Sequence, residues 1–208
     1  NMSHELRTPL TLILNPLEEV ASEGQGDERL NVALRNSRRL LRLVNQLLDF
    51  QKLSAGKREL KLEPINVVKF GRICGDYFSS ACSTKKITFH TTFNQELLSR
   101  DTSISSYVQG DLDALETIVF NFLSNALKYT PTDGSITLAI EEAADRLRFY
   151  VKDTGPGISR EGQQKLFQVF SQVDDSTTRA FEGTGLGLAL AKELTEKMDG
   201  QVGVESEL

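Results

Sequence analysis

The stretch DLDALETIVFNFLSNALKYT, residues 111–130, decides the fold of this chain. It predicts a strong helix that begins at Asp111 and ends near Tyr129. Two runs of alternating apolar and polar residues follow, Ser135–Glu141 and Arg146–Lys152, and they predict an antiparallel pair of strands. Helices and strands mix elsewhere without strict alternation, which favours an α+β sandwich whose helices cover one face of a sheet.

The flanking sequence adds further elements to this core. In chain order they are a strand at Leu60–Leu62 ended by Pro64, a helix from Val67 to about Ser80, a strand at Ile87–Phe93, a loop over 94–106, a strand at Tyr107–Gly110, a helix from about Gly185 to Met198 and a last strand near Gln201–Ser206. The first of these helices is expected to place five apolar residues on one face: Val67, Phe70, Ile73, Cys74 and Tyr77.

The first 54 residues follow a heptad-like pattern instead. A first helix is predicted from about Ser3 to Ser22, and its seam consists of Leu6, Leu10, Ile13, Leu17 and Val20. The glycines of EGQGD break this helix, and Asp27 caps a second one that ends near Leu53. So much apolar surface on one helical hairpin predicts a four-helix bundle made by two copies of the chain. Packing of the hairpin on its own C-terminal domain is the alternative.

Composition narrows the possible partners. The 208 residues carry a net charge of −5 and have a pI of about 5.2, which argues against nucleic acid and gives no reason for direct membrane contact. The two cysteines, Cys74 and Cys82, lack metal-ligand spacing and are expected in or near the core. No apolar run is long enough to span a bilayer, and the chain opens inside a motif at Asn1. We therefore expect a cytoplasmic fragment.

Two glycine motifs, DTGPGI (153–158) and GTGLGL (183–188), indicate an anion site. Glycine has no Cβ, so backbone amides approach a ligand closely, and a helix N-terminus after such a loop suits phosphate. No GK[ST] follows, so neither motif is a Walker A loop. Taken alone, the pair is equally compatible with two tight turns.

The helix from Asp111 carries a polar face made of Asn121, Asn125 and Lys128, which lie three or four residues apart. Amide oxygens can ligate Mg²⁺, which commonly takes one or two protein oxygens together with phosphates and water. The lysine would offset phosphate charge. A solvated polar face is the alternative for this motif alone.

The opening SHELRTPL carries a histidine at a b position of the heptad, pointing away from the bundle core. An exposed His4 is largely neutral at pH 7 and is a competent nucleophile. Glu5 adjoins it, and Thr8 lies one helical turn away on the same face. An ordinary solvated helix face is the alternative here.

In this order, these four stretches resemble the H, N, G1 and G2 boxes of sensor histidine kinases, and LFQVF (166–170) resembles their F box. TLILNPLEEV and QLLDFQKLSAGKRELKLEP resemble the hybrid two-component sensors. The resemblance covers almost the whole chain. It implies a dimerisation and histidine-phosphotransfer hairpin at 1–54, a hinge at 55–58 and a catalytic ATP-binding domain of the Bergerat type at 59–208.

The resemblance also assigns residue roles. It implies that His4 accepts the phosphoryl group, that Glu5 orients it or acts as a base, and that Thr8 positions water when such kinases act as phosphatases. Asn125 matches the Mg²⁺ ligand and Asp153 the carboxylate that receives the adenine amino group. The other expected nucleotide-binding residues are Asn121, Lys128, Tyr129, Gly155, Gly157, Phe170, Arg179, Gly183, Thr184, Gly185, Leu186 and Gly187.

The implied function is ATP- and Mg²⁺-dependent autophosphorylation of His4, followed by transfer to a receiver aspartate of a response regulator, in the cytoplasmic part of a membrane-anchored sensor. Two rivals differ from this protein-histidine kinase. An ATPase of the same superfamily would use a glutamate where Asn121 stands, and a neutral amide is a poor general base. A catalytically silent dimeric adaptor would not bind ATP.

Overall fold

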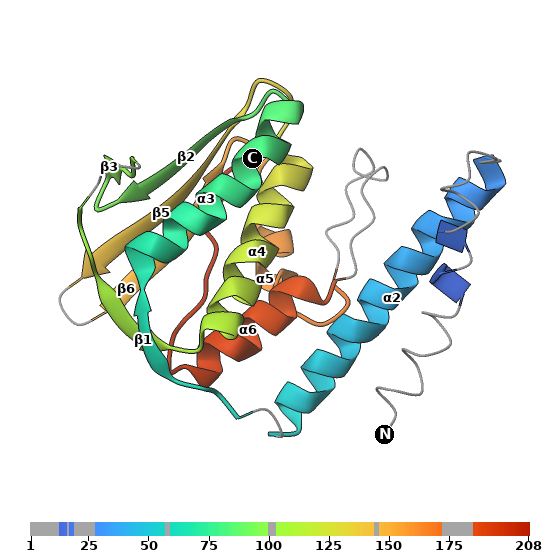
Figure 1. Cartoon of the computed structure of the whole chain (residues 1–208), viewed down its shortest axis with the longest axis horizontal. Coiled ribbons are helices and arrows are strands. Elements are labelled where there is room, and N and C mark those ends of the chain that lie inside the picture. The colour runs from blue at the N-terminus through green and yellow to red at the C-terminus, as the bar shows by residue number, and fades with distance from the viewer. Residues whose placement is uncertain are drawn as a thin grey trace. The chain divides into compact units, whose positions relative to one another are not determined.

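The structure is a computed structural model that describes residues 13–15, 17–18, 28–56, 59–99, 103–143, 146–171 and 185–208. The chain divides into two compact units, residues 1–58 and 59–208 (Figure 1). Over the part that is described, none of the helices combines the length and the apolar character needed to cross a bilayer.

The first unit contains the long helix α2, Glu28–Ser54. This confirms the second predicted helix, and three leucines of its apolar stripe are buried: Leu34, Leu48 and Leu53. The predicted first helix lies largely outside the described residues, although 13–15 and 17–18 are helical. Arg38 Nη2 contacts Glu18 Oε1 at 2.7 Å, and both side chains are well exposed, so the pair adds little stability.

The second unit is built on a mixed four-stranded sheet in the order β3-β2-β5-β6. β2 and β5 pair in parallel, whereas β2–β3 and β5–β6 are antiparallel. A separate antiparallel pair joins β1 to β4. The strands are β1 Glu63–Asn66, β2 Thr88–Phe93, β3 Glu96–Leu97, β4 Tyr107–Gly110, β5 Ser135–Ala143 and β6 Arg146–Asp153.

Helices cover one face of this sheet, which confirms the predicted α+β sandwich (Figure 1). They are α3 Val67–Thr84, α4 Leu112–Tyr129, α5 Arg160–Lys165 and α6 Gly187–Lys197. Apolar side chains of α3 and α4 meet those of the sheet in one core, which includes Phe70, Cys74, Phe78, Val119, Leu123, Ile136 and Leu138. A β-carbon on Gly71 would lie 2.6 Å from Ile140 Cδ1, so glycine lets α3 approach the sheet closely.

Two strand predictions were wrong. The first strand begins at Glu63 rather than Leu60, and Pro64 lies inside it opposite Gln109. A proline is tolerated there because β1 pairs on one side only and needs no ladder bond from every residue. The predicted last strand near Gln201–Ser206 is not formed; its contacts use Ser206, whose Oγ accepts from Ile158 N and whose carbonyl accepts from the Gln163 side chain.

The predicted apolar face of α3 was also partly wrong. Val67, Phe70 and Cys74 are buried, but Ile73 and Tyr77 are 57% and 67% exposed. The buried arc instead continues through Phe78 and Cys82.

Candidate active site

The Asp111 carboxylate fixes the position of α4, because it accepts hydrogen bonds from two separate segments of the chain. Asp111 is 6% exposed, and its Oδ1 accepts from Ala114 N at 2.8 Å, which caps the helix. Its Oδ2 accepts from Lys61 N, also at 2.8 Å. At the other end Lys85 Nζ donates to Leu127 O at 2.8 Å, where a cation suits the helix C-terminus.

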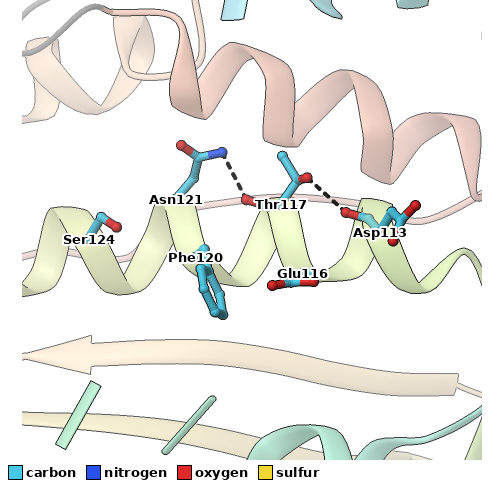
Figure 2. Close-up of a pocket in the computed structure, with 6 residues that line it drawn as sticks. All are labelled: Asp113, Glu116, Thr117, Phe120, Asn121 and Ser124. Atoms are coloured by element: carbon cyan, nitrogen blue, oxygen red, sulfur yellow. Dashed lines mark hydrogen bonds between the residues drawn. The ribbon is translucent and has the colours of Figure 1, made fainter. Parts of the chain in front are cut away.

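Asn121 lies where α4 meets the start of α6. Its Nδ2 donates to Thr117 O at 2.8 Å, and a β-carbon on Gly187 would collide with its Oδ1 and lie 3.2 Å from its Cγ. Figure 2 shows Asn121 projecting from α4 toward the ribbon of that neighbouring helix. Glycine at the first residue of α6 thus leaves room for the Asn121 side chain, which a larger residue would have to displace.

The turn after β6 meets the other end of α4. Gly155 N donates to Asp153 Oδ1 at 2.8 Å, and a β-carbon on Gly155 would lie 3.4 Å from Tyr129 O. Thr154 fastens this turn to β5, because its Oγ1 accepts from Ser135 N at 2.9 Å. The Asp153 carboxylate stays exposed at the end of its strand, where a ligand can reach it.

Asn125 and Lys128 lie on α4 between these two contacts. Asn125 is half-buried, and its amide makes no hydrogen bond among the residues that the structure describes. Lys128 Nζ donates to Tyr129 Oη at 2.7 Å and lies 4.4 Å from the centroid of that ring. The amide and the ammonium group are thus both near the surface.

The N-terminus of α6 is joined to the F-box-like segment. Phe170 N donates to Gly185 O at 2.9 Å, and a β-carbon on Gly185 would lie 2.8 Å from Phe170 Cα. Gly185 has φ +67°, which glycine adopts without strain. Leu186, 1% exposed, precedes the helix, and no side chain caps it. A helix N-terminus that no described side chain caps is suited to an anion.

The structure brings together the predicted residues of α4, the turn after β6 and the start of α6. It does not bear on His4, Glu5, Thr8, Arg179, Gly183 and Thr184, which lie outside the described residues. Gly157 stands apart from the others, with φ +79° and with the Glu207 carbonyl against the position of its missing side chain. Its glycine serves packing against the C-terminal segment.

A hollow of about 410 Å³ runs along the N-terminal part of α4 (Figure 2). Its walls are Asp113, Glu116, Thr117, Phe120, Asn121 and Ser124. Of the predicted nucleotide-binding residues only Asn121 lines it, and the two carboxylates would repel phosphate. The hollow is therefore a poor phosphate site, and the glycine-lined C-terminal half of α4 suits one better.

The described residues of the second unit offer few side chains for metal binding or thiol chemistry. No cluster of three or more His, Cys, Asp or Glu side chains occurs among the described residues, so a cage of protein ligands is not formed by them. Cys74 and Cys82 are free and buried, and burial raises the pKa of Cys74 to about 12. That thiol is consequently a packing residue.

Two polar residues of α4 were not singled out from the sequence. Asp111 was expected only at the start of the helix, and its bond to Lys61 links positions far apart in the chain. Thr130 caps the helix C-terminus and is 4% exposed, and its hydroxyl has no hydrogen-bond partner among the described residues. Serine or threonine directly after a helix is too common to identify such a residue.

Two family models match the chain. The family described as His Kinase A (phospho-acceptor) domain matches residues 1–56, and the family described as histidine kinase-, DNA gyrase B-, and HSP90-like ATPase matches residues 110–208. Together they match nearly all of the first unit and the C-terminal two thirds of the second.

Curated relatives match over nearly the whole chain. Sensor histidine kinase WalK of Bacillus subtilis is 37% identical over 99% of this chain and 33% of its own length. Hybrid signal transduction histidine kinase D of Dictyostelium discoideum is 33% identical over 99% of this chain and 13% of its own length. The chain thus spans a third or less of these two relatives.

Solved structures share the architecture. Full-length ShkA in complex with AMPPNP has a TM-score of 0.81 and 31% identity, and the match covers 100% of this chain and 42% of that one. The histidine kinase AdeS of Acinetobacter baumannii, with a TM-score of 0.63 over 93% of this chain and 86% of its own, is 23% identical and supports the fold alone.

Proposed function

The chain belongs to the sensor histidine kinases, which are ATP-binding protein-histidine kinases, and from that premise we propose that it transfers the γ-phosphoryl group of Mg²⁺-ATP to His4. The observation that supports this most is the pair of contacts along α4. Gly187 packs on Asn121 at one point and Gly155 packs near Tyr129 O at another. The N, G1 and G2 motifs therefore meet around the segment that carries Asn125.

Asn125 suits a Mg²⁺ ion bound together with ATP phosphates. Its amide oxygen is a hard ligand with no partner among the described residues, and no carboxylate cage competes for the ion there. When bound, Mg²⁺ would neutralise charge on the phosphates. Lys128 would add a second positive charge once its ammonium group leaves the Tyr129 hydroxyl.

Asp153 would receive the adenine amino group, as the resemblance implies, because its carboxylate is exposed at the end of β6. The first backbone amides of α6 would bind phosphate oxygens. Phe170, Gly185 and Leu186 would keep that helix start in place through the backbone bond between the first two. We assign Arg179, Gly183 and Thr184 to the phosphates by resemblance.

The transfer step would begin with neutral His4. A lone pair of the imidazole attacks the γ-phosphorus, an N–P bond forms, and the bond from that phosphorus to the bridging oxygen breaks as ADP leaves. Glu5 would accept a hydrogen bond from the other ring nitrogen and so fix the tautomer. Hydrolysis is disfavoured, because Asn121, whose amide donates to Thr117 O, cannot act as a general base for water.

The test is incubation of the chain with ATP labelled at the γ-phosphate. We expect label on the protein that is lost in acid and kept in alkali, as for phosphohistidine. His4→Gln should abolish the label and leave binding of an ATP analogue intact. Label that persists on His4→Gln would remove His4 as the acceptor.

A second variant tests the metal ligand. Asn125→Asp should slow Mg²⁺-ATP-dependent labelling, and Ser124→Ala is the matched control because Ser124 is the exposed neighbouring residue on the same helix. An unchanged labelling rate in Asn125→Asp would exclude Asn125 from the site.

We propose further that the hairpin forms a homodimeric four-helix bundle, which exposed Ile13 and Leu40 on the first unit support. His4 would then pass its phosphoryl group to a receiver aspartate of a response regulator, and Thr8 would position water when phosphatase activity removes it. The hybrid kinase among the relatives supports a receiver partner. That the chain is the cytoplasmic part of a membrane-anchored sensor is a further part of this proposal, and it rests on the resemblance to sensor histidine kinases.

A further inference from the structure

Asp111 connects α4 to the stretch of chain that joins the two units. This joining segment, residues 55–62, runs from the end of α2 to the start of β1. The backbone N–H of Lys61 donates to Asp111 Oδ2 at 2.8 Å, and the same carboxylate caps α4 by accepting from Ala114 N. One buried side chain thus holds the joining segment and the helix N-terminus together.

The joining segment gains little from burial where it meets Asp111. The side chains of Lys61 and Leu62 are both exposed. The ladder between β1 and β4 ends where Glu63 pairs with Gly110, so the bond from Lys61 N extends that ladder through a side chain. Because the acceptor is a carboxylate, this bond is stronger than one between neutral groups. We therefore expect it to determine where the joining segment leaves the second unit.

The anchored end of α4 is opposite the end that carries the nucleotide motifs. Asn125 lies about 21 Å along the helix from Asp111, at a rise of about 1.5 Å per residue. Figure 1 shows α6 alongside α4, and the first residue of α6 packs on Asn121. At the other end of α6, Sδ of its C-cap Met198 is 3.9 Å from where a β-carbon on Gly110 would lie. Both helices of the proposed ATP site therefore have their far ends at this anchor.

We propose that Asp111 is a positioning residue for phosphoryl transfer, which sets the place of bound ATP relative to the segment that leads to His4. The role rests on the proposed function, and it acts through α4, because Asp111 is too far from Asn125 to touch the nucleotide. The joining segment is the covalent path from the second unit to the hairpin that carries His4. Slack at its anchor lowers the fraction of encounters in which the γ-phosphate and the imidazole are aligned. Loss of the bond should therefore slow the transfer and leave the affinity for ATP unchanged.

The bond can be broken from either of its two sides in the full chain. Asp111→Asn keeps an oxygen to cap α4, because asparagine is as good an N-cap as aspartate, and turns an NH₂ group toward Lys61 N. Lys61→Pro removes the N–H and leaves Asp111 intact, and Lys61 has a negative φ, as proline requires.

The two variants should slow the reaction without weakening nucleotide binding. At saturating Mg²⁺-ATP, the rate of labelling from γ-labelled ATP should fall about three- to tenfold in each, as expected for one hydrogen bond to a charged group. The affinity and stoichiometry for Mg²⁺-AMPPNP, measured by calorimetry, should stay within about twofold of the unchanged chain.

Three controls separate this positioning role from a loss of stability. The double variant should be no slower than either single variant, because both changes remove the same bond. Lys61→Ala changes only an exposed side chain and should be labelled at the unchanged rate. Asn66→Ala removes the N-cap of α3, which accepts from Lys69 N at 3.0 Å, and should lower the stability comparably without slowing the labelling.

Several results would overturn the role of Asp111. They are an unchanged labelling rate in Asp111→Asn and Lys61→Pro, a loss of AMPPNP affinity that accounts for the slowing, additive losses in the double variant, and equal slowing by Lys61→Ala or Asn66→Ala. All of them leave the proposed function standing, which is refuted instead when the unchanged chain takes no acid-labile label.

Discussion

Replacing Asp111 by alanine should destabilise the second unit, and two hydrogen bonds that its carboxylate accepts set the size of the effect. The bond from Ala114 N is a helix N-cap, whose loss costs about 1 kcal/mol. The bond from Lys61 N is also made to a charged acceptor, and its loss costs about 1.5 kcal/mol. We therefore expect Asp111→Ala to lower the free energy of unfolding by about 2.5 kcal/mol, or about 5–10 °C in melting temperature for a unit of this size.

Tyrosine fluorescence during urea unfolding gives a clean assay. The chain has four tyrosines, all within residues 59–208, and no tryptophan, so the signal reports on the second unit alone. Asp111→Ser keeps the cap and should lose only about 1.5 kcal/mol. Asp113→Ala, an exposed carboxylate in the same helical turn, is the control and should cost less than about 1 kcal/mol. If Asp111→Ala costs no more than this control, the two bonds do not hold α4 in place.

Three other predictions concern single side chains. Gly187→Ala should weaken binding of Mg²⁺-AMPPNP at least about tenfold by overpacking the start of α6. Gly203→Ala, whose new methyl group would meet open space, should leave the affinity unchanged. Equal affinities of the two variants for Mg²⁺-AMPPNP would refute the steric argument. Cys74, with a pKa of about 12, should resist an aromatic disulfide reagent at pH 8 until guanidinium unfolds the chain, and rapid native labelling would contradict its burial. The pKa of Tyr150 is raised because its hydroxyl donates to Glu141 Oε1 at 2.9 Å. The stability from this pair is therefore complete below the ordinary tyrosine pKa and is lost as pH rises through the folded value. Glu141→Gln should lower the pKa of Tyr150 in an ultraviolet titration, and an unshifted curve would show that the carboxylate is not the cause.

Elements whose signals are local were predictable from the sequence. Asp111 and the apolar periodicity after it define both the start and the buried face of α4 within one stretch. The β5–β6 hairpin is equally local, since its two alternating runs are almost adjacent. α2 has a long apolar stripe and so could be bounded to within a few residues.

Elements that depend on a partner were not predictable. Alternation at 201–206 fits a strand. A strand also needs a neighbouring backbone to form a ladder, and no described segment pairs with these residues. Pro64 is incompatible with a central strand but compatible with an edge strand, and the sequence does not show which kind of strand contains it. On α3 two apolar arcs overlap, and the close approach at Gly71 decides that Phe78 rather than Tyr77 faces the core.

The candidate site divides in the same way. Each motif could be found from its own residues, and the chemistry of Asn125 and Asp153 follows from their side chains. Their arrangement comes from contacts between segments distant in sequence, such as Gly187 with Asn121. That the Thr130 hydroxyl is buried without a hydrogen-bond partner among the described residues is a property of the folded state and has no counterpart in the sequence.

The parallel pairing of β2 with β5 sets the order in which the second unit can assemble during translation. Thr88 pairs with Ser135, so β2 leaves the ribosome well before its main partner, and its other neighbour, β3, offers only two residues. The β5–β6 hairpin closes over a short connection and should form early, with docking of β2 as the slow step. A nascent chain paused before residue 135 would therefore expose an unpaired strand edge, and we expect aggregation to be favoured in that interval.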